Sequence, residues 1–197
     1  MPTRAERQAQ TREALVGTAR SLFLHDGYAA TSLDRVAVEA GFSKGAVYSN
    51  FKSKEELGLA VLDEIHREMV AEVVEALSIA TAYEDALHAL EGWLKVRLGQ
   101  PRWTALEVEF AAVVRTSPFV ATELATRHRQ IRAAIASLLV ELQQRTGMRL
   151  ALPADQVALV LLSLGIGLGA QRSLDPGLDV HAFTATIRSL LLPPDAA

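Results

Sequence analysis

The stretch LDRVAVEAGFSKGAVYSNF, residues 33–51, decides the fold. Its pattern predicts two short helices that meet at a tight turn. Ala37 supplies the small residue that is needed where the second helix crosses the first. Gly41, four residues later, tolerates the positive φ that such a turn requires. Val47, six residues after Gly41, supplies a branched apolar anchor that faces back to the first helix. This spacing is that of a helix-turn-helix.

Helix start and stop signals recur on both sides of this stretch. A first helix is expected from Arg4 to His25, ended by Gly27 in a left-handed position. Ser32 and Ser43 are placed to cap the two short helices, and Ser53-Lys-Glu-Glu56 is a capping box. No segment alternates apolar and polar residues. The pattern therefore predicts an all-α protein, whose short helices cover about 33–40 and 44–51 and whose later helices cover about 54–80, 83–99, 102–116, 118–146, 153–174 and 179–192.

The composition favours a helical protein of one or two domains. The 197 residues are 50% hydrophobic and contain no cysteine, which excludes disulfides, Cys-ligated zinc and thiol catalysis and fits a reducing cytoplasm. The N-terminus has no apolar core of the kind that a signal peptide needs. Residues 1–54 hold eight Lys or Arg and five Asp or Glu, a net +3, whereas the remaining residues carry −6. A basic head on an acidic body favours contact between the head and a polyanion.

The exposed face of the second short helix has the properties of a DNA-reading surface. It combines one cation, several hydrogen-bonding groups and small residues at its leading end, and it has no acid. Such a helix N-terminus can enter a major groove and approach phosphates closely. Hydroxyls just before the first short helix and a lysine after the second would contact the DNA backbone. The DNA-binding candidates are Thr31, Ser32, Ser43, Lys44, Gly45, Ala46, Tyr48, Ser49, Asn50 and Lys54.

From Thr31 to Leu57, the block TSLDRVAVEAGFSKGAVYSNFKSKEEL closely resembles the signature of TetR-family regulators. Ala19, Leu22, Phe23, Gly27 and Tyr28 resemble that family's first helix and its exit, so the match covers about residues 10–62. The resemblance implies a DNA-binding domain over 1–53, joined through a long helix to an effector-binding and dimerisation domain over 54–197. Asn50 departs from the histidine that is common in the family but keeps a donor and an acceptor. Ser49 is also unusual, which leaves base specificity open.

The apolar run from Val157 to Ala170 has fourteen residues without a charge, fewer than the ~20 that span a membrane. Gly165 and Gly169 lie on one helical face and permit close approach of another helix, whereas a dinucleotide loop is excluded because no strand precedes them. A helix that is apolar all round must be buried. With Phe183, Ile187, Leu190 and Leu191 of the last helix, it is expected to form a four-helix homodimer interface. The alternative is the central core helix of a monomer.

Residues of the C-terminal part are candidates for an effector site, because they lie on helices that line the cavity in TetR-family proteins. A mostly apolar cavity with one or two polar groups suits a small hydrophobic effector. For each residue the alternative is core packing or a surface ion pair. The five histidines are scattered without metal-ligand spacing, and no cofactor motif is present. The ligand-binding candidates are Trp93, Arg97, Trp103, Glu107, Phe110, His128, Gln171 and Arg172.

The sequence therefore predicts a cytoplasmic, homodimeric transcriptional repressor that binds a pseudo-palindromic DNA operator and is released by a small effector. Effector binding would shift the long fourth helix and so change the separation of the two DNA-binding domains. The rival hypothesis is a helical carrier or enzyme with a non-DNA-binding corner, in which Glu107, Glu109 and His128 would be the acid–base candidates. Activation in place of repression, and two dimers on one operator, remain open.

Overall fold

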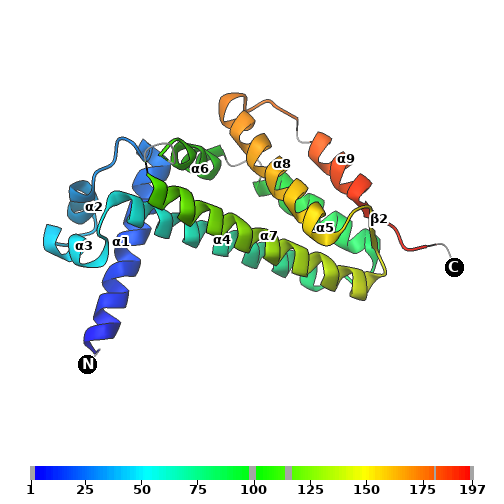
Figure 1. The fold of residues 1–197 in the computed structure, drawn as a ribbon, viewed down its shortest axis with the longest axis horizontal. Helices are drawn as coiled ribbons and strands as arrows, with labels where there is room; N and C mark the ends of the chain where they lie inside the picture. Colours follow the sequence, from blue (N-terminus) through cyan, green and yellow to red (C-terminus); the bar gives the residue numbers. More distant parts are fainter. Residues whose placement is uncertain (1–2, 98–100, 114–116, 180, 196–197) are drawn as a thin grey trace. The chain divides into compact units, whose positions relative to one another are not determined.

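The computed structural model describes residues 3–97, 101–113, 117–179 and 181–195, and it confirms the all-α prediction (Figure 1). Two strands of two residues each pair antiparallel, with Arg149 opposite Leu192; the sequence did not indicate them. In chain order the elements are α1 (Arg4–Asp26), α2 (Leu33–Glu39), α3 (Lys44–Asn50), α4 (Lys54–Ser78), α5 (Tyr83–Arg97), α6 (Pro101–Val113), α7 (Pro118–Thr146), β1 (Arg149–Leu150), α8 (Ala154–Leu174), α9 (His181–Leu190) and β2 (Leu191–Leu192).

The helix ends differ from the expected ones where other contacts compete. The last helix stops at Leu190 rather than at residue 192, because the next two residues pair with β1. It starts at His181, whose backbone N–H donates to the side chain of Asp179. The ends predicted at residues 99 and 116 lie outside the described residues.

The chain forms two compact units. The head unit consists of Met1–Ile65 and Leu106–Leu124, and the body unit consists of His66–Ala105 and Ala125–Ala197. α4, α6 and α7 each contribute residues to both units. The head unit continues past residue 53 because Leu57, Val61 and Leu62 of α4 are completely or almost completely buried. A separate DNA-binding domain over 1–53 stays a prediction.

Two glycines shape the head unit. Gly41 adopts φ +72° at the turn between α2 and α3, which confirms the predicted turn. Gly27, which ends α1, has φ +91° but ψ 152°, so it is not in the expected left-handed helical conformation. It occupies instead a second region of positive φ that is almost restricted to glycine. The chain therefore leaves α1 in an extended direction that leads to α2.

The helix-turn-helix packs as its spacing predicts. Val36 and Ala37 of α2 are buried against Val47 of α3, and Phe51, the C-cap of α3, is also fully buried. Ser32, Ser43 and Ser53 cap their helices through hydrogen bonds of 3.2 Å from backbone N–H groups. The expected capping box of α4 is incomplete, because the Glu56 carboxylate accepts from the N–H of Lys52 rather than from that of the cap residue.

The body unit has a continuous apolar core formed mainly by α5, the end of α7, α8 and α9. Gly169 of α8 lies against the Thr104 side chain, and a Cβ at Gly169 would come within 2.7 Å of Thr104 Cγ2, so the predicted close approach is confirmed there. At Gly165 nothing lies within 4 Å of that position.

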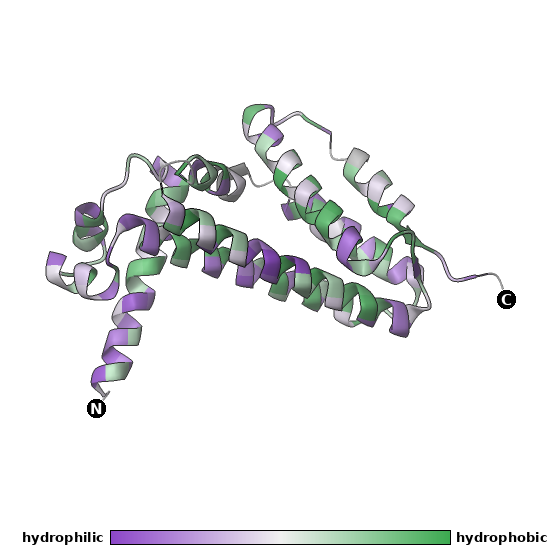
Figure 2. Ribbon diagram, viewed as in Figure 1, coloured by the Kyte–Doolittle hydropathy of each residue, from purple (hydrophilic) through white to green (hydrophobic). Residues whose placement is uncertain are grey.

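α8 is long and apolar but is only partly covered in the single chain. Figure 2 shows it largely green or pale, with purple near its ends. The structure describes all 21 of its residues, of which four are buried: Val157, Ala158, Leu168 and Gly169. By length and composition alone this helix could cross a membrane, which the fourteen-residue charge-free run did not indicate; an interface helix of a soluble protein would pass the same test.

Candidate nucleic-acid interface

α3 presents a narrow polar face at the surface of the head unit. Val47 is its buried residue. Its exposed residues are Lys44, Gly45, Tyr48 and Ser49, and Ala46 and Asn50 are partly exposed. The seven residues of α3 include no acid. Ser43 accepts from the Ala46 N–H as the N-cap, so its hydroxyl is already engaged in holding the helix start. The arrangement leaves small residues at the leading end of α3, as a major-groove helix requires.

Tyr48 is the largest exposed side chain of α3, with 55% of its surface accessible. It follows Val47, which is completely buried, and precedes Ser49, which is exposed. Because its neighbour anchors the helix, Tyr48 is held on the surface without contributing to the core. A phenol in this position can reach phosphate oxygens with its hydroxyl and apolar base edges with its ring.

The two polar residues at the end of α3 bond to their own helix. Ser49 Oγ donates to the Ala46 carbonyl at 2.9 Å, and Asn50 Nδ2 donates to the same oxygen at 2.8 Å. Asn50 Nδ2 also donates to Ser49 Oγ at 3.5 Å, so both hydrogens of this amide nitrogen point to partners on α3. Phosphate contact by Asn50 and base contact by Ser49 stay predictions.

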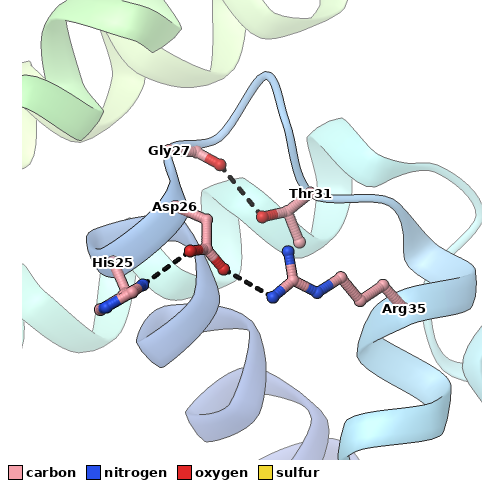
Figure 3. Close-up of polar contacts among 5 residues, drawn as sticks. All are labelled: His25, Asp26, Gly27, Thr31 and Arg35. Atoms are coloured by element: carbon pink, nitrogen blue, oxygen red, sulfur yellow. Dashed lines mark hydrogen bonds and ion pairs between the residues drawn. The ribbon is translucent and has the colours of Figure 1, made fainter.

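The segment before α2 holds one buried candidate and one exposed candidate, both in the head unit. Thr31 is 1% exposed, and its hydroxyl donates to the Gly27 carbonyl at 3.0 Å (Figure 3). Ser32 is exposed at the start of α2. Figure 3 also shows Arg35 of α2 paired with Asp26 at 2.7 Å. The hydrogen bond to His25 lowers the pKa of Asp26, and burial opposes this while the charge of Arg35 lowers it further.

Lys54 lies against the loop between α1 and α2. Its Nζ donates to the Ala29 carbonyl at 3.2 Å and lies 4.2 Å from the centre of the Tyr28 ring. Burial lowers the pKa of Lys54, whereas the carboxylates of Glu55 and Glu109 raise it. The ammonium group is thus partly desolvated and already has partners. The predicted phosphate contact by Lys54 would have to compete with these interactions.

Two residues that bear on α3 were not identified from the sequence. Arg12 of α1 donates to the Asn50 carbonyl at 2.9 Å, and its guanidinium lies 4.2 Å from the centre of the Phe51 ring. Asp34 of α2 accepts from Lys44 Nζ at 2.5 Å. Both contacts join residues of different helices, so the periodicity within one helix carries no signal for them.

The effector candidates of the body unit include one ion-pair cluster. Arg97 forms an ion pair with Glu72, in which its Nε lies 2.5 Å from Oε2, and Trp93 Nε1 donates to the same carboxylate at 3.3 Å. All three side chains are partly exposed. His128 and Arg172 are also partly exposed, and Gln171 is exposed with its amide donating to the Gly167 carbonyl at 3.4 Å.

The remaining effector candidates lie on α6. Phe110 belongs to the head unit, where its ring is completely buried, packs on Tyr28 with ring centres 4.6 Å apart and occupies the space where a Cβ at Gly58 would stand. Glu107 is buried in the same unit and has a partner. The side chain of Trp103 lies outside the described residues. Ligand contact by any of these eight residues stays a prediction. The described residues include no group of His, Asp and Glu that could hold a metal ion.

Two family models match this chain. The model described as bacterial regulatory proteins, tetR family, matches residues 15–61, which contain α2, α3 and about half of α1. The model described as BetI-type transcriptional repressor, C-terminal, matches residues 82–192. Together they cover the helix-turn-helix and more than half of the chain.

Similar curated proteins are named as HTH-type transcriptional regulators. The uncharacterized HTH-type transcriptional regulator YerO of Bacillus subtilis is 43% identical over 54 residues, 27% of this chain and 19% of YerO. The HTH-type transcriptional regulator TcmR of Streptomyces glaucescens is 26% identical over 143 residues, 69% of this chain and 62% of TcmR. The chain thus spans less than two thirds of the length of these curated relatives. The crystal structure of reduced E. coli NemR is similar in fold, with a TM-score of 0.76, 22% identity and coverage of 95% of this chain and 100% of NemR.

Proposed function

The chain belongs to the TetR family of bacterial transcriptional regulators, and from this premise we propose that it is a cytoplasmic repressor that binds a pseudo-palindromic operator as a homodimer and is released by a small hydrophobic effector. Family membership also makes it a regulator and not an enzyme. Each recognition helix, α3, would enter one major groove, with half-sites about one to two helical turns apart.

The observation that carries the proposal is the exposed face of α3. A seven-residue helix without an acid presents Lys44 and Tyr48 to solvent and is anchored from behind by Val47 and Phe51. A rigidly mounted helix with a polar, carboxylate-free face is what sequence reading in the major groove requires. A helical carrier has no need for such a face.

The uncovered apolar surface of α8 supports the homodimer. Leu159 is 48% exposed, and Leu162 and Ile166 follow it on the same face and are partly exposed. Four residues near the C-terminal end were expected to face the partner protomer. They are buried in the core of the single chain instead: Phe183, Ile187, Leu190 and Leu191. They turn inward because α9 packs on α8 of its own chain. A dimer contact would therefore use the exposed face of α8 rather than these side chains.

Leu159→Arg is expected to dissociate the dimer. Leu159 is already about half covered, so if each protomer buries the rest of this side chain against its partner, its loss removes about 0.7–1.5 kcal/mol from each half of the interface. The dissociation constant should therefore rise roughly tenfold or more. Analytical ultracentrifugation across a concentration series measures the change.

Ile79→Arg is the matched control for this test. Ile79 is 84% exposed and follows α4, outside the sequence of α8, so this variant should remain dimeric. Circular dichroism should show unchanged helicity in both variants, because both positions are exposed. A Leu159→Arg protein that sediments as a dimer with wild-type affinity would argue against the α8 interface.

An effector would act by binding one conformation of the dimer more tightly than the other. Only such a difference in affinity can shift the equilibrium away from the state that docks both recognition helices. Thr104 supports an effector that places a polar group near α8. Its hydroxyl is buried and has no hydrogen-bond partner among the described residues. An unpaired buried hydroxyl is unfavourable by about 1–3 kcal/mol, which a ligand or water could relieve.

Fluorescence anisotropy tests the proposed function. Purified full-length protein is titrated onto a labelled duplex from upstream of its own gene, with scrambled competitor DNA and at two salt concentrations. Tight, competitor-resistant binding that weakens with salt is the expected result. The same assay then identifies effectors by the release of DNA. If no duplex is bound even at low salt, the repressor proposal fails and saturable ligand binding would favour a carrier.

A further inference from the structure

Asp34 places a carboxylate beside the first residue of the recognition helix. It lies in the first turn of α2, and its Oδ2 accepts from Lys44 Nζ at 2.5 Å. The ion pair is exposed, with 66% of the Lys44 side chain and 48% of the Asp34 side chain accessible. The hydrogen bond from Lys44 to Asp34 raises the pKa of Lys44, so the ammonium stays charged.

The neighbouring charged residues do not compete for Asp34 or Lys44. Arg35, the next residue of α2, is paired with Asp26 at 2.7 Å. α3 itself contains no acid, so the carboxylate next to Lys44 comes from α2. In the free protein, the cation at the leading end of α3 is therefore already neutralised by a partner from the supporting helix.

We propose that Asp34 is a specificity-determining residue, which competes with DNA phosphates for Lys44 and so suppresses binding to non-operator DNA. The inference rests on the proposed function. Non-specific binding consists almost entirely of contacts between cations and phosphates, and each such contact releases counterions. A lysine held by a carboxylate makes no such contribution unless the DNA offers a better partner. A correctly docked α3 offers one, because Lys44 then reaches a base edge or a fixed phosphate in the groove.

The proposal has a quantitative consequence for non-operator DNA. Asp34→Asn keeps the size and the polar character of the side chain but leaves Lys44 free to pair with a phosphate. Affinity for scrambled duplex should rise about three- to tenfold at low salt, and the slope of log affinity against log salt should steepen by about 0.9. Operator affinity should change less, so the ratio of operator to scrambled affinity should fall.

The experiment is a double-mutant cycle on the full-length protein. The four proteins are wild type, Asp34→Asn, Lys44→Gln and the double variant, each titrated by anisotropy with two labelled duplexes. One duplex is the upstream sequence that wild type retains against competitor, and the other is its scrambled form. Salt is varied from about 50 to 200 mM, the range over which phosphate contacts change affinity strongly. Glu39→Gln is the matched control, because Glu39 is exposed at the other end of α2.

The expected result is a gain on scrambled DNA that appears in Asp34→Asn, is absent in Glu39→Gln and disappears when Lys44 is also replaced. Equal gains with and without Lys44, or an equal gain in Glu39→Gln, would show only a general effect of negative charge and would overturn the proposal. No gain in Asp34→Asn would also overturn it, while operator binding by wild type would leave the proposed function intact. If wild type itself retained no duplex, the proposed function would fail and this inference with it.

Discussion

Tyr48→Ala is expected to weaken operator binding by an order of magnitude or more. Tyr48 is 55% exposed on α3, so its removal takes away an exposed ring and hydroxyl without opening the core. A tenfold loss corresponds to about 1.4 kcal/mol, which is within the range of one good contact to a base or phosphate. Anisotropy on the retained upstream duplex measures the change.

Tyr48→Phe separates the two parts of the side chain. If the hydroxyl contacts a phosphate, the phenylalanine variant should lose most of the affinity that the alanine variant loses, and its salt dependence should stay close to that of wild type because no cation is removed. Thermal melts of both variants should match wild type. Wild-type operator affinity in Tyr48→Ala would contradict the proposed contact.

Phe110→Ala is expected to destabilise the protein by about 3–5 kcal/mol, the usual loss when a buried aromatic ring is removed. The Phe110 ring is completely buried, packs on Tyr28 and fills the space left by the missing side chain of Gly58. Gly58 has no side chain that could move into the resulting cavity. Urea unfolding followed by circular dichroism at 222 nm measures the loss.

Phe110→Leu is the control, because it retains most of the apolar volume and should be destabilised by a smaller amount. The same pair of variants tests the alternative role of this residue in effector binding. If Phe110→Ala kept wild-type stability but lost effector-induced release from DNA, the ring would be a ligand contact rather than a core residue.

The helix-turn-helix is predictable because its information is local. Ala37, Gly41 and Val47 lie within eleven residues, and each meets a steric requirement that the backbone imposes at that position. The capping serines are equally local, since each bonds to a backbone N–H three residues ahead. Short-range sterics and caps of this kind act before any long-range contact forms.

The candidate interface was only partly predictable, because several of its contacts are not local in the sequence. The residues of α3 could be assigned to its exposed face from helical periodicity, and Tyr48 lies there. The partners of Lys44, Lys54 and Asn50 could not, because they depend on which side chains of other elements come within reach. Long, flexible side chains choose among several partners by small differences in energy that no spacing rule contains.

The sequence by itself determined the helical class, the recognition helix and its supporting turn, and through them the family, because these depend on residue types at fixed short separations. Only the tertiary structure decided that Phe183, Ile187 and Leu190 face the core of their own chain while one face of α8 stays uncovered. An apolar helix must be buried, but its composition does not say by which chain. That choice depends on the packing of helices that are distant in sequence. Burial of the same apolar area is equally favourable against the same chain and against a partner chain.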